Sequence, residues 1–104
     1  MPTAEIEELK NCFVRQLSPL RVYLFGSFAE GRQNDDSDYD FYIVVNDDTK
    51  DIISTTAQAY KSVRRAKTRP VDIVVGTSSR FESRKGIPSL ESEVYRKGVL
   101  LYAQ

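Results

Sequence analysis

Three aspartates, Asp38, Asp40 and Asp72, carry the strongest indication of chemistry in this sequence. Asp38 and Asp40 stand two residues apart at the start of an apolar run, which predicts a strand over residues 38–45. Side chains alternate between the two faces of a strand, so we expect both carboxylates on one face. Two like charges held together on a buried element repel each other, and a divalent cation would remove that penalty.

Asp72 lies within a second apolar run, Val71 to Val75, where an acid is costly unless it is paired or bound to metal. If this strand lies beside residues 38–45, three carboxylates meet at one edge of the sheet. Mg²⁺ prefers oxygen ligands and shares them with phosphates. Three acids around two Mg²⁺ ions form the arrangement that a two-metal phosphoryl displacement requires.

A Gly26-Ser27 pair separates a short apolar strand, expected over residues 20–25, from a helical turn over residues 28–30. A helix N-terminus offers free N–H groups to phosphate, and glycine allows the backbone to approach closely. Ser27 and Glu30 also match a capping box, which would be purely structural. No Walker loop is present, because no Gly-Lys-Thr/Ser follows.

Other residues near these motifs allow more than one interpretation. Asp-x-Asp is common in turns, and Asp72 could pair with Arg69 instead of a metal. Arg32 could contact a phosphate or extend into solvent. The basic cluster from Lys61 to Arg69 suits the negative end of a helix, and could also be a docking surface. The conjunction of the glycine-serine pair with three acids favours the metal site.

Composition removes several functional classes. The 104 residues contain no histidine, which excludes a Ser-His-Asp site and histidine-ligated zinc, and one cysteine, Cys12, which we expect to be a half-buried structural thiol. Fifteen basic and 15 acidic residues give zero net charge, so a nucleic-acid partner is disfavoured. The longest apolar runs are too short for a membrane span, and the first five residues do not resemble a signal peptide. We therefore expect a cytoplasmic protein.

Hydrophobic periodicity predicts one domain over residues 1–104, with a mixed β-sheet flanked by helices in an α/β (α+β) fold. Thr3 is expected to cap the first helix, and residues 78–86 to be partly helical. The main elements in order are a helix at 3–17, a strand at 20–25, a helical turn at 28–30, a strand at 38–45, a long helix ending near 66, a strand at 70–76, a helix at 88–97 and a final strand or extended tail at 98–103.

The spacing of the motif resembles that of the nucleotidyltransferase superfamily that includes DNA polymerase beta. Its hallmark is Gly-Ser, ten residues, Asp-x-Asp and a later third Asp, as in Gly26-Ser27, Asp38, Asp40 and Asp72. The chain is similar to the minimal nucleotidyltransferases of the MntA antitoxin type, also in its C-terminal residues 93–102. Glu30 and Asn34 depart from the basic residues that are frequent in relatives.

The resemblance implies a polymerase beta-like fold, ATP as donor and two Mg²⁺ ions. By the same resemblance, Gly26 and Ser27 hold the triphosphate, Asp38 and Asp40 bind both metals, and Asp72 binds the catalytic metal near the incoming hydroxyl. The expected reaction moves AMP to a tyrosine of a HEPN-domain toxin.

Two other functions remain open from the sequence. The chain could be an antitoxin that inhibits its toxin by contact alone, with an idle metal site. It could also modify a small molecule such as an antibiotic, although enzymes of that kind usually hold the acceptor with a second domain.

Overall fold

The computed structural model describes residues 3–104 of the chain. Residues 1 and 2, part of the N-terminal stretch discussed above, lie outside the described residues. The elements in order are α1 (Ala4–Leu17), β1 (Arg21–Phe25), α2 (Ser27–Glu30), β2 (Tyr39–Val45), α3 (Ile52–Val63), β3 (Val71–Thr77), α4 (Ser78–Arg84), α5 (Leu90–Lys97) and β4 (Val99–Ala103).

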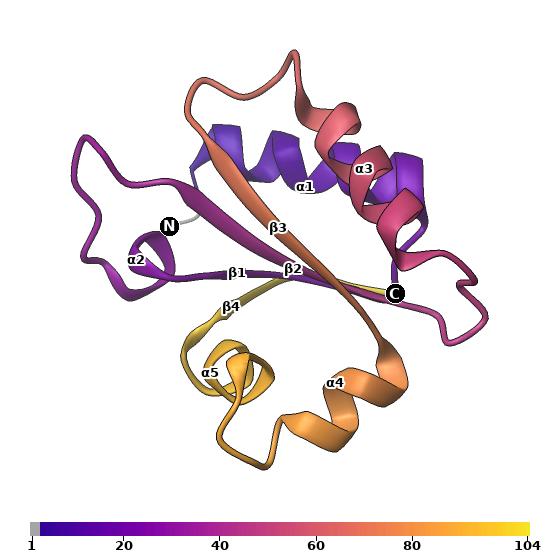
Figure 1. The fold of residues 1–104 in the computed structure, drawn as a ribbon. Coiled ribbons are helices and arrows are strands. Elements are labelled where there is room, and N and C mark those ends of the chain that lie inside the picture. The colour runs from indigo at the N-terminus through magenta and orange to yellow at the C-terminus, as the bar shows by residue number, and fades with distance from the viewer. Residues whose placement is uncertain (1–2) are drawn as a thin grey trace.

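The sheet has four strands in the order β3-β2-β1-β4. β2 runs parallel to β3, while β1 pairs antiparallel with both β2 and β4. Helices α1 and α3 cover one face of this sheet, and α4 and α5 lie on the other side (Figure 1). The predicted fold class, a mixed sheet flanked by helices, is confirmed.

β2 is central because its sequence is apolar on both faces. Every residue from Phe41 to Val45 is buried, as expected for a strand with neighbours on both sides and helices above and below. The larger core lies between the sheet and helices α1 and α3, and it includes Ile6, Phe13 and Phe41. The smaller core faces α4 and α5 and includes Tyr42 and Phe81.

Local capping chemistry fixes the helix boundaries. Thr3 caps α1 as predicted, since its side chain accepts a hydrogen bond from the Ile6 N–H at 3.3 Å. Asp51 and Ser89 do the same for α3 and α5. α3 ends at Val63 rather than near residue 66, and the next three residues continue as turns. None of the helices within residues 3–104 is long and apolar enough to cross a membrane.

Candidate active site

The ends of three strands bring the predicted residues together. In the strand register, Phe25 at the end of β1 lies opposite Asp40 on β2, and Asp40 lies opposite Asp72 on β3. Gly26 directly follows β1, so the glycine-serine corner and both acids occupy one end of the sheet. Since Tyr42 packs in the smaller core, alternation puts Asp40 on the same face as Tyr42, the α4 and α5 face.

Asp40 lies directly against the backbone of Gly26. A Cβ atom added to Gly26 would overlap the Asp40 carboxylate and come within 3.1 Å of its Cγ. Gly26 also has a φ of 76°, in the region that residues with side chains rarely adopt. Two independent constraints, backbone conformation and the position of the carboxylate, therefore require glycine here.

The acids repel one another electrostatically. Burial, followed by the negative charges of Asp72 and Asp38, raises the pKa of Asp40 to about 6. This is the behaviour expected when like charges share a partly buried site. The carboxylates thus form a strained negative pair that a cation would stabilise.

The structure corrects two expectations about these acids. Asp38 precedes β2 by one residue, so strand alternation does not orient its side chain. Asp72 is exposed, because β3 is an edge strand. Its carboxylate therefore loses less hydration free energy on folding than an acid buried within a sheet would. Within residues 3–104, no group of three acidic side chains is already arranged to hold a metal ion.

Ser27 is not the helix cap that the capping box predicted. Gly26 occupies the N-cap position of α2, and no side-chain hydrogen bond caps the helix. Ser27 is instead the first helical residue, because the positive φ of Gly26 lets the helix begin one residue early. Glu30 forms an ion pair at 3.3 Å with Arg32, whose side chain is 63% exposed.

Arg69, which the sequence showed only as part of a basic cluster, contacts the segment that precedes Asp38. Its guanidinium lies 5.0 Å above the ring of Phe28 and 5.5 Å above that of Tyr39. It also donates to the backbone carbonyl of Ser37 at 2.9 Å, just before Asp38. Arg69 makes no ion pair with Asp72, so that alternative is wrong for the described part of the chain. Only the loss of helical periodicity after α3 could have separated Arg69 from its basic neighbours.

Tyr39 and Glu5 tie the start of β2 to α1. The Tyr39 hydroxyl donates to Glu5 at 2.6 Å, and Glu5 also accepts from the Thr68 N–H at 2.5 Å. A short network therefore joins the loop before β3 and the first turn of α1 to the strand that carries Asp40. It has no recognisable sequence signature, since its residues lie far apart in the chain.

A glycine-serine corner packed against paired carboxylates at the end of a mixed sheet is an arrangement suited to phosphate-group transfer. The chain belongs to the polymerase beta nucleotidyltransferase family, whose family model matches residues 7–104. No curated protein matches the chain at a significant level.

Solved structures share this fold. A toxin–antitoxin structure with AMP-PNP is 25% identical, with a TM-score of 0.67 over 98% of this chain and 75% of that chain. A mutant of the MntA–HpeT toxin–antitoxin pair is 20% identical, with a TM-score of 0.64 over 98% and 75%. A structure from Sulfolobus solfataricus, provisionally assigned as a nucleotidyltransferase, is 22% identical, with a TM-score of 0.61 over 96% and 78%.

Proposed function

We propose that this protein is an antitoxin-type nucleotidyltransferase that moves AMP from ATP to a tyrosine hydroxyl of a HEPN-domain toxin in the cytoplasm. The observation that carries the proposal is the contact of Gly26 with Asp40, which itself lies beside Asp72. This corner places the start of α2 beside carboxylates that a divalent cation would neutralise. Membership of the nucleotidyltransferase family supports the reaction class.

The residues present fit Mg²⁺ in their chemistry. Asp40 and Asp72 offer hard oxygen donors side by side, and burial together with the charges of Asp72 and Asp38 raises the pKa of Asp40 to about 6. Asp38 is close enough to contribute to that pKa and would complete the donor set. When bound, Mg²⁺ would neutralise charge on the phosphates and favour ionisation of the acceptor hydroxyl.

The reaction balances as a single displacement at the α-phosphorus of ATP. The acceptor oxygen forms a bond to this phosphorus, and the bond to the bridging oxygen of the β-phosphate breaks. Pyrophosphate leaves with the electron pair, and Asp72, the more exposed carboxylate, accepts the hydroxyl proton. Gly26 and Ser27 orient the triphosphate through the start of α2, and Asp40 orients the donor.

The kind of partner is inferred from the solved structures that share this fold. The structure with AMP-PNP is a toxin–antitoxin complex, and this chain overlaps 75% of the matched chain. Zero net charge disfavours a long nucleic-acid acceptor, since phosphate contacts dominate such binding. A folded protein that presents its own hydroxyl is therefore the acceptor we favour.

A second candidate is an antitoxin that acts by contact alone. One observation favours it: within residues 3–104, no three acids stand ready as a metal-ligand set. Under this alternative the carboxylate pair is idle, and the partner would be bound without modification.

Intact-mass spectrometry of the partner toxin, co-expressed with this protein, separates the two candidates. We expect a gain of one AMP per modified tyrosine with the wild type. Asp38→Asn, Asp40→Asn and Asp72→Asn should each lower transfer by on the order of 100- to 10,000-fold. Asp36→Asn, an exposed acid of the same loop, is the matched control and should retain activity.

Three further experiments test the proposed function. Excess EDTA should abolish transfer by the wild type, and activity that persists would exclude metal dependence. Asp72→Asn should still bind ATP, since its proposed contact is with the acceptor. An unmodified partner in a stable complex, with ATP and Mg²⁺ present, would support the contact-only antitoxin.

A further inference from the structure

β3 is an edge strand, and half of that edge is open. The N–H of Ile73 points away from β2 and donates to the Tyr60 hydroxyl at 2.9 Å. Backbone groups alternate along a strand, so the N–H groups of Val75 and Thr77 point the same way. Within residues 3–104, neither of these two N–H groups donates a hydrogen bond to a side chain or to a backbone group outside the sheet. Tyr60 thus closes the edge at Ile73, and the edge stays available over residues 75–77.

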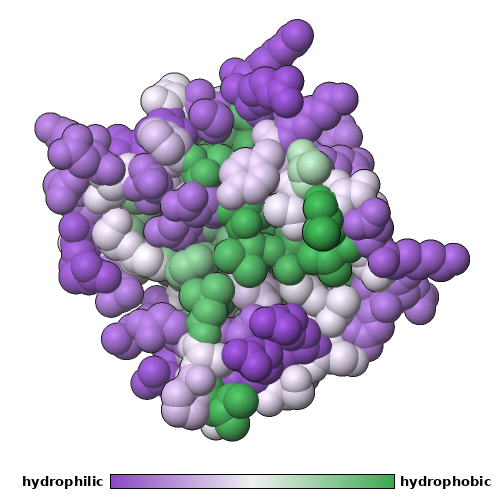
Figure 2. Space-filling view, viewed as in Figure 1, coloured by the Kyte–Doolittle hydropathy of each residue, from purple (hydrophilic) through white to green (hydrophobic). Residues whose placement is uncertain are grey.

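A groove runs along this open part of the edge. Ile52 at the start of α3 and Leu90 at the start of α5 form its apolar walls, and Val74 and Gly76 form its floor. The Leu90 side chain is 39% exposed although it is large and apolar. Figure 2 shows a hydrophobic area with polar margins on the face where Figure 1 draws β3. An apolar groove beside free backbone donors suits an added β-strand.

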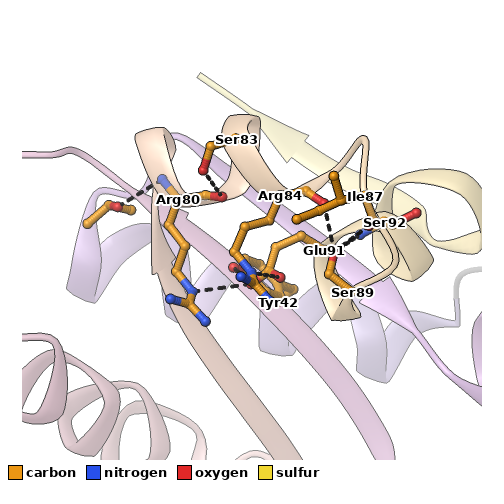
Figure 3. Close-up of polar contacts among 9 residues, drawn as sticks. Tyr42, Arg80, Ser83, Arg84, Ile87, Ser89, Glu91 and Ser92 are labelled. Carbon is orange, nitrogen blue, oxygen red and sulfur yellow. Dashed lines mark hydrogen bonds and ion pairs between the residues drawn. The ribbon is translucent and has the colours of Figure 1, made fainter.

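A buried carboxylate lies beneath the groove floor and is bound by side chains from two elements, β2 and α4 (Figure 3). Glu91 is 2% exposed and accepts from the Tyr42 hydroxyl at 2.7 Å and from Arg84 at 3.0 Å. Arg80 approaches the same carboxylate at 3.4 Å, with its side chain 58% exposed at the rim. A Cβ on Gly76 would overlap the Tyr42 hydroxyl, so β3 lies directly on this network.

The groove leads to the candidate active site. Asp72, Val74 and Gly76 alternate onto one face of β3, the face on which Asp40 also lies. Asp72 is five residues from Thr77, which corresponds to about 17 Å of extended chain. A bound segment of roughly six residues would therefore span this distance if it pairs with β3 over residues 75–77 and passes the Tyr60 hydroxyl at Ile73 without pairing there.

We propose that the acceptor protein docks an extended segment on the open edge of β3, which places its hydroxyl-bearing residue beside Asp72. The proposal rests on the proposed function, because it assigns the groove to the acceptor of that reaction. Main-chain bonds to Val75 and Thr77 give affinity, and Ile52 and Leu90 bind apolar side chains of the segment. Continuity with Asp72 favours an acceptor segment over a second copy of this chain.

Hydrogen exchange of the full chain, with the partner toxin at saturation, tests docking independently of catalysis. We expect the Val75 and Thr77 amides to become protected by at least about tenfold, which corresponds to one new hydrogen bond. If these amides exchange as fast with the partner as without it, the proposal is overturned. Protection that appears without partner, and rises with the concentration of this chain, would assign the edge to a second copy and overturn it as well.

Two substitutions with matched controls test the groove in the transfer reaction. Leu90→Lys should raise KM for the acceptor at least tenfold, whereas Leu100→Lys, 50% exposed on the opposite edge strand, should not. Thr77 has a φ of −72°, which proline adopts without strain. Thr77→Pro removes the N–H and the hydroxyl that caps α4, and Thr77→Ala removes only the hydroxyl. The KM for the acceptor should be about 3- to 10-fold higher with Thr77→Pro than with Thr77→Ala, because only the proline variant lacks the N–H.

Failure of the two proposals can be told apart. If the wild type transfers no AMP, the proposed function fails, and amide protection still decides the docking. If the wild type transfers AMP while Leu90→Lys and Thr77→Pro match their controls, the docking proposal is overturned and the proposed function stands.

Discussion

Asp40 is the residue at which stability and proposed function oppose each other most clearly. Its pKa is raised to about 6, so the ionised form is disfavoured in the folded protein relative to an ordinary carboxyl with a pKa of 3.8. The resulting cost in folding free energy is absent well below pH 3.8, grows between pH 3.8 and about 6, and is fully present above about pH 6. Removing the charge should therefore stabilise the metal-free protein near neutral pH.

We predict that Asp40→Asn raises the free energy of unfolding at pH 8 by about 1 to 2 kcal/mol, after allowance for solvent screening. The gain should be largely lost near pH 3, below the ordinary pKa of 3.8, where the wild-type carboxyl is mostly protonated in both states. Thermal melts in EDTA at the two pH values measure this. With Mg²⁺ and ATP the order should reverse, since only the wild type gains from the ligands. A variant no more stable than wild type at pH 8 would show that the acids do not repel.

Ser27 offers a second residue-scale prediction, because its hydroxyl caps nothing. Ser27→Ala should change the free energy of unfolding by less than about 0.5 kcal/mol, as for substitutions away from structural features. If the hydroxyl contacts phosphate, KM for ATP should rise several-fold. Urea melts and ATP titration of transfer measure the two effects. An unchanged KM for ATP would remove Ser27 from the phosphate site.

At the scale of elements, the attachment of α4 and α5 to the sheet depends on Glu91. Burial by itself would raise the pKa of Glu91, but hydrogen bonds from Tyr42 and Arg84 outweigh burial, so the pKa lies below its ordinary value. The stabilisation is therefore present above the ordinary pKa of 4.5 and lost as the pH falls below it. The side chains of Arg80 and Arg84 are 58% and 39% exposed. Loss of their buried partner Glu91 should therefore destabilise the protein more than loss of a pair that is exposed on both sides.

We predict that Glu91→Gln costs about 2 kcal/mol at pH 7, less than a fully buried pair because Arg80 and Arg84 reach solvent. Its control is Glu93→Gln on the same helix, which loses only the 3.4 Å surface pair with Lys97 and should cost under about 0.5 kcal/mol. The difference between wild type and Glu91→Gln should shrink below pH 4. Equal effects of the two substitutions would contradict a structural role for the buried carboxylate.

Periodicity and capping were sufficient to predict the elements, but not the details of the site. The apolar run of β2 indicated a central strand, and Thr3 marked the start of α1. The edge position of β3 could not be predicted, because Val71 to Val75 is as apolar as β2, and the pattern therefore predicted a buried Asp72. Contacts between distant residues, such as Glu5 with Tyr39 and Tyr42 with Glu91, leave no periodic signal. The role of Gly26 against Asp40 required the strand register.

At the scale of the whole molecule, the two faces of the sheet have different tasks. Helices α1 and α3 cover one face of the sheet and bury the larger core (Figure 1). The α4 and α5 face carries Asp40 and Asp72 at one end and the groove beside β3 at the other. Under the two proposals, ATP held at Gly26 and an acceptor docked on β3 would approach the carboxylates from different directions, as an in-line displacement requires.

The most direct test of the central claim uses ATP labelled at the α-phosphate and, in parallel, ATP labelled at the γ-phosphate. Each is incubated with Mg²⁺, the partner toxin and either wild type or Asp40→Asn, and the label on the partner is measured. The account predicts label on the partner only from the α-phosphate, only with the wild type and only without EDTA. Label from the γ-phosphate, or equal labelling by Asp40→Asn, would contradict nucleotidyl transfer at these carboxylates.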